Sequence, residues 1–202
     1  MISLAGRDIM HAWGKFAFPG VDAKALLDNS SADLWVVQRG TLGPYAEASS
    51  LQDDLYRGIL GMPGVARAAN ITYLTMQVLR DQGDVRAMVV GVSPGGPGEP
   101  GHPKQLIAGR HIIRSHYEAV ADSASGLRLN EQIQIRRQHY QVVGLTQRMV
   151  SSNGDPMIFI PLRDAQEAQF LKDNDAIWQQ RRRTASNPAV ARNQVPGLLE
   201  AL

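Results

Sequence analysis

The sequence predicts an α+β fold, in which a mixed lobe of strand–helix–strand–strand order carries an inserted, small β-rich lobe. Three observations support this class. Short apolar runs such as 85–92 and 157–161 have the length of buried strands. Apolar residues in 51–60 recur at helical spacing instead. Residues 93–103 contain four prolines and four glycines, so they form a loop or a boundary between lobes.

The N-terminal segment 1–21 is expected to be an amphipathic helix that ends at Pro19 and Gly20. Apolar residues fall near one side of a helix over 2–18, namely Ile2, Ile9, Met10, Trp13 and Phe16. Two interpretations remain open. The helix either packs on the domain or lies on a membrane surface.

Residues 22–100 are expected to form the first half of the mixed lobe. The elements are, in chain order, a strand over 34–38, a helix over 51–60, and two strands within 65–79 and 85–92 that form a hairpin around a turn at 81–84. Ser49 or Ser50 is the expected N-cap of the helix. Asp53 and Asp54 would lie in its first turn, where carboxylates interact favourably with the helix dipole.

The inserted β-rich lobe is expected to span 101–156, and a return strand and helix to span 157–172. The elements expected in the inserted lobe are a helix over 111–124 and short strands within 126–150. The return segment consists of a buried strand over 157–161 and a helix over 162–171. Together, residues 22–172 make up the expected core domain. Residues 173–202 are polar and weakly patterned, which predicts a tail that is helical or disordered.

The composition argues against several classes of function. Lysine and arginine number 21 against 19 acidic residues, and the only tight basic run, 181–183, is typical of a solvated helix face. This balance does not indicate a nucleic-acid partner. The chain has no cysteine, which excludes disulfides, thiolate metal sites and cysteine nucleophiles. No window reaches the roughly 18 apolar residues of a membrane span.

Motif searches give no catalytic, cofactor-binding or metal-binding residues. The segment Gly91-Val92-Ser93-Pro94-Gly95 fits the nucleophile elbow of serine hydrolases. The elbow must run straight into a helix, which the prolines forbid, and Pro94 lacks the N–H that the oxyanion requires. No phosphate loop and no dinucleotide-binding glycine pattern is present in the sequence.

The histidines do not have the spacing of a metal site. They are His11, His102, His111, His116 and His139. On the helix expected over 111–124, His111 and His116 would point about 140° apart, too far for one metal ion. Surface or hydrogen-bonded roles are therefore the favoured interpretation.

The order of elements resembles the extracytoplasmic core domain of MacB/FtsX-like ABC transporter permeases, including the DevC-like subgroup. Four stretches between about 25 and 170 carry the resemblance: "ALLDNSSADLWVVQRGT", "LYRGILGMPGVARAANITYL", "AMVVGVSP", and the segment from "LIAGRHI" through "VVGL" to "MIFIPLRDAQ". The segment "LAGRDIMHAWGKF" is similar to the amphipathic helix that these permeases place at the cytoplasmic membrane surface before their first span. The resemblance therefore implies that 1–21 is a membrane-proximal remnant. Trp35 would be a core anchor of the first strand.

The resemblance implies a non-enzymatic function without a cofactor. The domain would lie on the periplasmic or extracellular side of a bacterial inner membrane and transmit ATPase-driven motion to an adaptor or substrate during export. The implied partners are an ABC ATP-binding subunit, a periplasmic adaptor (membrane fusion) protein and a second copy of the permease. The exported substrate and the substrate-binding residues stay unknown.

One departure from the family is plain. Residues 17–21 are too few to hold a membrane span between the N-terminal helix and the extracytoplasmic segment. The chain is therefore expected to be an engineered fragment, a truncated gene product or a soluble relative. The alternative function is a soluble regulatory module that binds a ligand or peptide through the proline/glycine loop and the β-rich lobe.

Overall fold

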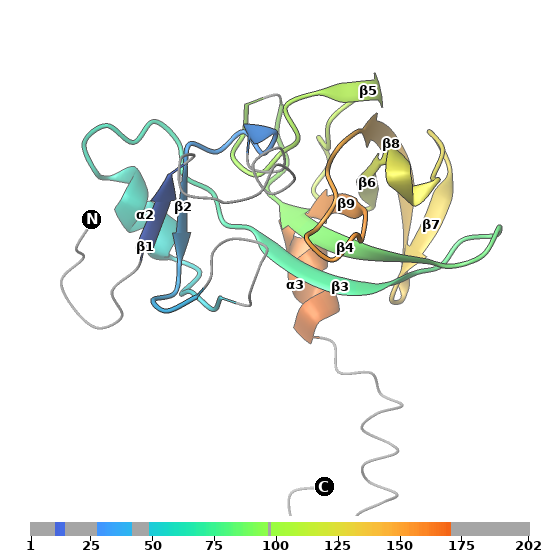
Figure 1. The fold of residues 1–202 in the computed structure, drawn as a ribbon, viewed down its shortest axis with the longest axis horizontal. Helices are drawn as coiled ribbons and strands as arrows, with labels where there is room; N and C mark the ends of the chain where they lie inside the picture. The colour runs from blue at the N-terminus through green and yellow to red at the C-terminus, as the bar shows by residue number, and fades with distance from the viewer. Residues whose placement is uncertain (1–10, 15–27, 42–48, 97, 171–202) are drawn as a thin grey trace, which may run out of the picture. The chain divides into compact units, whose positions relative to one another are not determined.

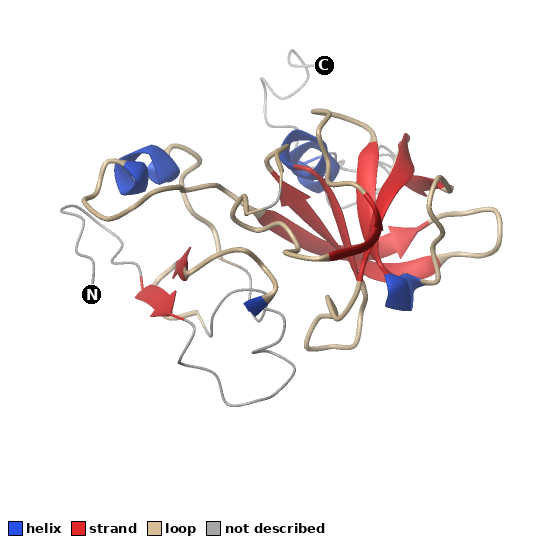
Figure 2. Cartoon of the chain, turned by 90° about the horizontal axis from the view of Figure 1, so that it is seen from above, coloured by secondary structure: helices blue, strands red, loops and turns tan. Residues whose placement is uncertain are grey.

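The computed structural model describes residues 11–14, 28–41, 49–96 and 98–170. Strands dominate this part of the chain, and helices are few (Figures 1 and 2). The elements are β1 (His11–Gly14), β2 (Leu34–Val37), α2 (Leu55–Leu60), β3 (Thr72–Val78), β4 (Val85–Val92), β5 (Leu106–Gly109), β6 (Glu118–Asp122), the 3₁₀ turn Ser123–Ser125, β7 (Gln132–Ile135), β8 (Gln138–Thr146), β9 (Met157–Pro161) and α3 (Leu162–Phe170). The predicted α+β class is confirmed.

Within the described residues, seven strands form one mixed sheet in the order β3-β4-β9-β6-β8-β5, with β7 also paired to β8. The pairs β4–β9 and β6–β8 are parallel and the others antiparallel. The first and last strands of the path β3-β4-β9-β6-β8-β7 meet where Leu79 bridges Gln134 through two backbone hydrogen bonds of 2.9 and 2.8 Å. Six strands therefore close into a ring.

Side chains alternate between the inside and the outside of this ring, as the pleat of a strand requires. The inner cluster takes residues from all six ring strands: Val78, Ala87, Val89, Ala119, Ala121, Ile133, Ile135, Tyr140, Val142, Ile158 and Ile160. The intervening residues Met88, Val90, Val92, Met157 and Phe159 face outward and join a second cluster. Because residues 87–92 of β4 and the whole of β9 are buried on both faces, these stretches are continuous apolar runs in the sequence.

The second cluster includes Trp35 of β2, which is 9% exposed, and Ala32. The expectation that Trp35 anchors the first strand is confirmed. The proline/glycine segment is a loop, as predicted. Backbone hydrogen bonds from Gly101 to Ser30 (2.9 Å) and from Lys104 to Asn29 (2.8 Å) fix its end against the residues before β2.

Several predicted elements match the structure closely. The strands expected over 34–38, 85–92 and 157–161 are β2, β4 and β9, and the helix expected over 162–171 is α3. The hairpin of β3 and β4 has the expected turn, with seven residue pairs in register from Thr72–Gly91 to Val78–Val85. β7 and β8 account for the strands expected within 126–150.

The prediction of a helix over 111–124 is wrong. Residues 110–117 form an irregular loop, and β6 follows between β8 and β9. Ala119 and Ala121 face the inner cluster while Val120 faces the outer one, so all three are buried. Pairing with two strands distant in sequence outweighs the local helical spacing.

One expectation near the N-terminus also needs correction. Residues 11–14 are not helical but form β1, which pairs antiparallel with β2. The remainder of 1–21 lies outside the described residues, and so does the whole of 171–202, which includes the predicted tail 173–202. The boundaries proposed for the core domain and its inserted lobe stay a prediction.

The helix expected over 51–60 begins only at Leu55. Asp54 occupies its N-cap position without a side-chain cap, whereas the Ser49 hydroxyl accepts a hydrogen bond from the Gln38 N–H (2.7 Å). Asp53 lies before the first turn and accepts from the Asn70 amide. The prediction of a serine cap and of two acidic residues in the first turn is therefore wrong.

Candidate functional site

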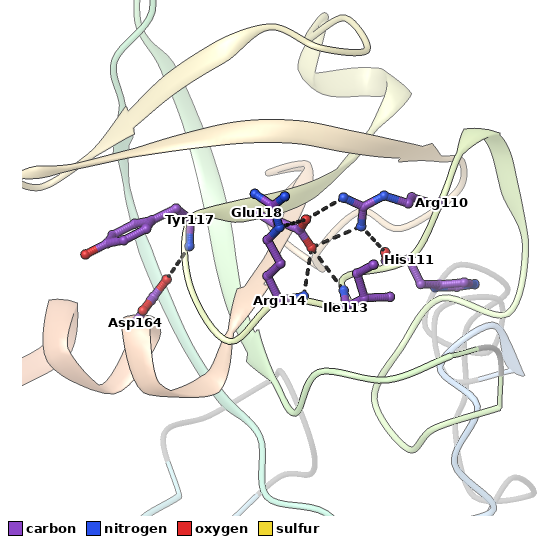
Figure 3. Close-up of polar contacts among 7 residues, drawn as sticks. All are labelled: Arg110, His111, Ile113, Arg114, Tyr117, Glu118 and Asp164. Carbon is purple, nitrogen blue, oxygen red and sulfur yellow. Dashed lines mark hydrogen bonds and ion pairs between the residues drawn. The ribbon is translucent and has the colours of Figure 1, made fainter.

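The loop 110–117 connects β5 to β6 and has no regular secondary structure. Two buried carboxylates hold it, Glu118 at the start of β6 and Asp164 in the first turn of α3 (Figure 3). Buried carboxylates are costly unless hydrogen bonds and cations compensate them. Both of these side chains direct their oxygen atoms at the loop, so its conformation is the feature that they stabilise.

Glu118 accepts four hydrogen bonds. The Arg110 guanidinium binds its two oxygen atoms in a bidentate pair, with Nη1 3.1 Å from Oε2. The backbone N–H groups of Ile113 and Arg114 each donate to Oε2 at 3.0 Å, and the Arg114 side chain approaches Oε1 at 3.6 Å. One buried carboxylate thus fixes both the backbone and the cationic side chains of the loop.

These contacts keep Glu118 ionised. Burial alone would raise the pKa of its carboxyl group. The hydrogen bonds from Arg110, Arg114 and Ile113 outweigh burial and lower the pKa to about 2. The carboxylate therefore holds the loop at any pH at which a folded protein normally works.

Asp164 holds the other end of the loop. Its Oδ2 accepts from the Tyr117 N–H at 3.0 Å, and its Oδ1 is hydrogen-bonded to His116 Nδ1. Tyr117 has a φ of 64°, a left-handed conformation that is uncommon for an aromatic residue. A hydrogen bond of 3.0 Å from the Gln141 N–H to the Tyr117 carbonyl holds this conformation from the opposite side.

The loop side chains that these carboxylates position are largely exposed. Ile113 is 64% and Tyr117 51% exposed, although both are large apolar side chains. The Arg114 side chain is 76% and that of His116 47% exposed. The arrangement presents apolar and cationic groups on a fixed backbone, which is the chemistry of recognition.

A third buried carboxylate stabilises the other end of β6. Asp122 is 1% exposed and accepts two backbone N–H bonds, from Ala124 at 2.8 Å and from Met149 at 2.7 Å. It caps the 3₁₀ turn and ties it to the segment before β9. These bonds stabilise the fold and leave no oxygen directed at the 110–117 loop.

The serine of the rejected elbow motif lies in the proline/glycine loop directly after β4. Its carbonyl oxygen is 2.6 Å from His102 Nε2, which must therefore be the protonated nitrogen, since a carbonyl only accepts. Burial lowers the pKa of His102. Its ring packs edge-on against that of His111, with centroids 5.7 Å apart. Ser93 thus supports a histidine through its backbone.

The histidine side chains do not come together around a common site. His111 contacts His102, whereas His116 contacts Asp164 and the Tyr117 ring. Burial, and then the neighbouring His102, lower the pKa of His111. His139 is exposed on β8, and the side chain of His11 lies outside the described part. In the part of the chain that the structure describes, no group of three or more potential ligands is placed to hold a metal ion.

Sequence analysis missed the residues that build this site. Arg110, Glu118 and Asp164 were not singled out, because no motif joins them and 47 positions separate Tyr117 from Asp164. One signal was available. Glu118 and Asp122 bracket the apolar Ala119–Ala121, a pattern in which two charged residues end a buried strand.

The sequence model of the MacB-like periplasmic core domain matches residues 20–193. The chain belongs to this family. The match includes β2 to α3 and therefore the whole 110–117 loop with both of its carboxylates. Along the part that the structure describes, no helix is long and apolar enough to cross a membrane.

Relatives of this MacB-like domain include an uncharacterized ABC transporter permease of Mycobacterium tuberculosis, found in strains CDC 1551 / Oshkosh and ATCC 25618 / H37Rv. In each strain the identity is 24% over 151 residues, which covers 74% of this chain and 42% of the relative. The chain thus spans less than half the length of the relatives that it matches.

Two solved structures are distant likenesses. The extracellular domain of the noncanonic ABC-type transporter YknZ from Gram-positive bacteria has a TM-score of 0.45 at 13% identity and covers 65% of this chain and 70% of that one. The periplasmic region of MacB from Actinobacillus actinomycetemcomitans has a TM-score of 0.44 at 12% identity and covers 57% of each chain.

Proposed function

We propose that this MacB-like domain works in an ABC-type export permease, where it transmits motion driven by a separate ATPase. It acts outside the bacterial inner membrane and passes the motion to an adaptor protein or to the exported substrate, without catalysing a reaction itself. The observation that carries the proposal is the family match over 20–193, which extends through the continuous sheet.

The fixed loop supports this proposal. Residues 110–117 are bonded to β6 through Glu118 and to α3 through Asp164, so the loop is joined to two separate elements of the domain. A surface held in this way moves with the elements that hold it. A domain that transmits displacement requires such a coupling between its framework and its outer surface.

The proposed partners are an ABC ATP-binding subunit, a periplasmic adaptor and a second copy of the permease. The first test uses the permease that carries this domain, reconstituted with its ATP-binding subunit. Because the 202-residue chain has no cysteine, single cysteines introduced into it can be spin-labelled without background from the domain. Leu60, 45% exposed on α2, is one suitable position.

A label at Leu60→Cys should report a distance between two copies that changes when ATP is trapped on the ATP-binding subunit. The matched control places both labels within one domain, at Arg136→Cys and Arg163→Cys, where the distance should stay constant. The absence of any distance between copies, or one that ignores nucleotide, contradicts the proposal. In that case the alternative, a soluble regulatory module that binds a ligand or peptide, gains support.

A further inference from the structure

We propose that the 110–117 loop is a preformed docking site for an acidic segment of a partner protein. The inference deepens the function proposed above and rests on it, because it assigns a surface and a partner chemistry to the extracytoplasmic contact. The loop is distinguished by three properties that are independent of one another: its exposed apolar side chains, its exposed cationic side chains over buried carboxylates, and its fixed backbone.

The loop exposes large apolar side chains. Of the eight large hydrophobic residues that are exposed in the described part, Ile113 and Tyr117 lie in the loop, and Ile107 lies just before it on β5. A soluble domain normally leaves such side chains scattered singly. Tyrosine and arginine are also enriched at protein interfaces, and tyrosine supplies contact area there at a low cost in conformational entropy.

The charge of the loop is complementary to an acidic partner. Residues 110–117 contain two arginines and two histidines but no acidic residue. Glu118 and Asp164 balance the two arginines in number, and on α3 the exposed Arg163 and Glu167 offset each other. Both of the balancing carboxylates are buried, whereas the Arg114 side chain is 76% exposed and retains guanidinium N–H groups for a carboxylate of the partner. The charge that the loop presents at its surface is therefore cationic.

The loop is already ordered in the conformation that it presents. Two carboxylates bind three of its backbone N–H groups, and the left-handed Tyr117 is held on both sides. Strained, over-determined backbone of this kind clusters at sites that clamp a ligand. A partner that docks here does not have to order the loop, which removes part of the free-energy cost of binding.

The same observations favour a protein over a lipid surface. Attraction to anionic lipid depends on the number of cations and requires no particular orientation, at about 1 kcal/mol for each lysine or arginine. Glu118 does the opposite, since it reduces the net charge of the loop, binds both amino groups of Arg110 and lies 3.6 Å from Arg114 Nε. The exposed guanidinium of Arg114 is the group that can match the bidentate geometry of a single carboxylate on a defined partner.

The test selects peptides from a random dodecapeptide library on the immobilised 202-residue chain. Selected peptides should carry aspartate or glutamate next to an apolar residue. The double variant Ile113→Ser/Arg114→Gln should weaken their binding, measured by fluorescence anisotropy, by about tenfold or more. The matched control, Leu60→Ser/Arg137→Gln at exposed positions away from the loop, should change affinity by less than about twofold.

A second comparison does not depend on the folding of any variant. Replacing the acidic residues of a selected peptide with their amides should weaken its binding to the unmodified chain by a similar factor. Enrichment of peptides without acidic residues, no enrichment, or binding that ignores the loop variant overturns the inference. So does loop-dependent binding to phosphatidylglycerol vesicles in place of peptides.

Failure of this inference can be separated from failure of the proposed function. The nucleotide-dependent distances between copies would persist if only the docking site were wrong. Conversely, acidic peptides selected through the loop would stand even if those distances did not respond to nucleotide.

Discussion

Replacing Glu118 with glutamine tests whether the buried carboxylate stabilises the loop and the fold. The substitution keeps the shape of the side chain but removes its charge and leaves one acceptor oxygen where there were two. That oxygen can still accept from the N–H groups of Ile113 and Arg114, or from Arg110, but not from all four donors. The amide nitrogen would face one donor directly.

The lowered pKa of Glu118 gives the size of the expected loss of stability. Lowering it from an ordinary 4.5 to about 2 corresponds to about 3 kcal/mol of stabilisation at neutral pH. Because the folded pKa is depressed, this contribution is complete above pH 4.5 and is lost as the pH falls towards 2. At pH 3 less than half of it remains. The Arg110 side chain is 45% exposed and regains water in the variant, which limits the cost of its lost partner.

Urea denaturation followed by circular dichroism at pH 7 and pH 3 measures both values. With a slope of about 2 kcal/mol per molar urea, the Glu118→Gln midpoint should fall by about 1.5 M at pH 7 and by less than half of that at pH 3. The control is Glu99→Gln, which affects an exposed ion pair with Arg67 at 3.7 Å and should cost about 0.5 kcal/mol or less. A cost at pH 7 no larger than the control, or equal costs at both pH values, would refute the reasoning.

Three further substitutions test the packing around the site. Gly109→Ala should lower the free energy of unfolding by at least about 2 kcal/mol, because φ is +76° and the new methyl group would lie 2.2 Å from a backbone oxygen of β8. Thermal unfolding measures this loss. The control is Gly58→Ala, in open space on α2, which should instead stabilise the protein by up to about 1 kcal/mol. Asp122→Asn should cost about 1–3 kcal/mol in urea, since one buried N–H loses its acceptor, and an unchanged midpoint would contradict this. Trp35→Ala should lower the free energy of unfolding by about 3 kcal/mol, and a loss below 1 kcal/mol would show that β2 packs little against the sheet.

The sequence predicted most accurately those elements whose pattern is set by local composition. β4 and β9 are continuous apolar runs bounded by turn residues, and both were located to the residue. The hairpin of β3 and β4 followed from two such runs around a polar turn. In these cases the same residues determine the local conformation and the burial.

The loop and β6 could not be derived in the same way. Glu118 and Asp122 are four positions apart, as on one face of the helix expected over 111–124, yet both are buried on a strand. What makes their burial possible is the set of donors from Arg110, Ile113, Arg114 and Met149, which only the tertiary fold brings together. The candidate site was missed for this reason, since its members share no motif and come from separate elements.

The closure of the ring also determines where the domain would yield under tension. β3 and β4 are joined by seven registered pairs and β4 and β9 by five, whereas a single bridge between Leu79 and Gln134 joins β3 to β7. A load that spreads these strands would open this seam first and turn the ring into an open sheet with two new edges. This bridge is therefore the weakest junction of the ring, and the amide hydrogens of Leu79 and Gln134 should exchange with solvent before those of the longer ladders.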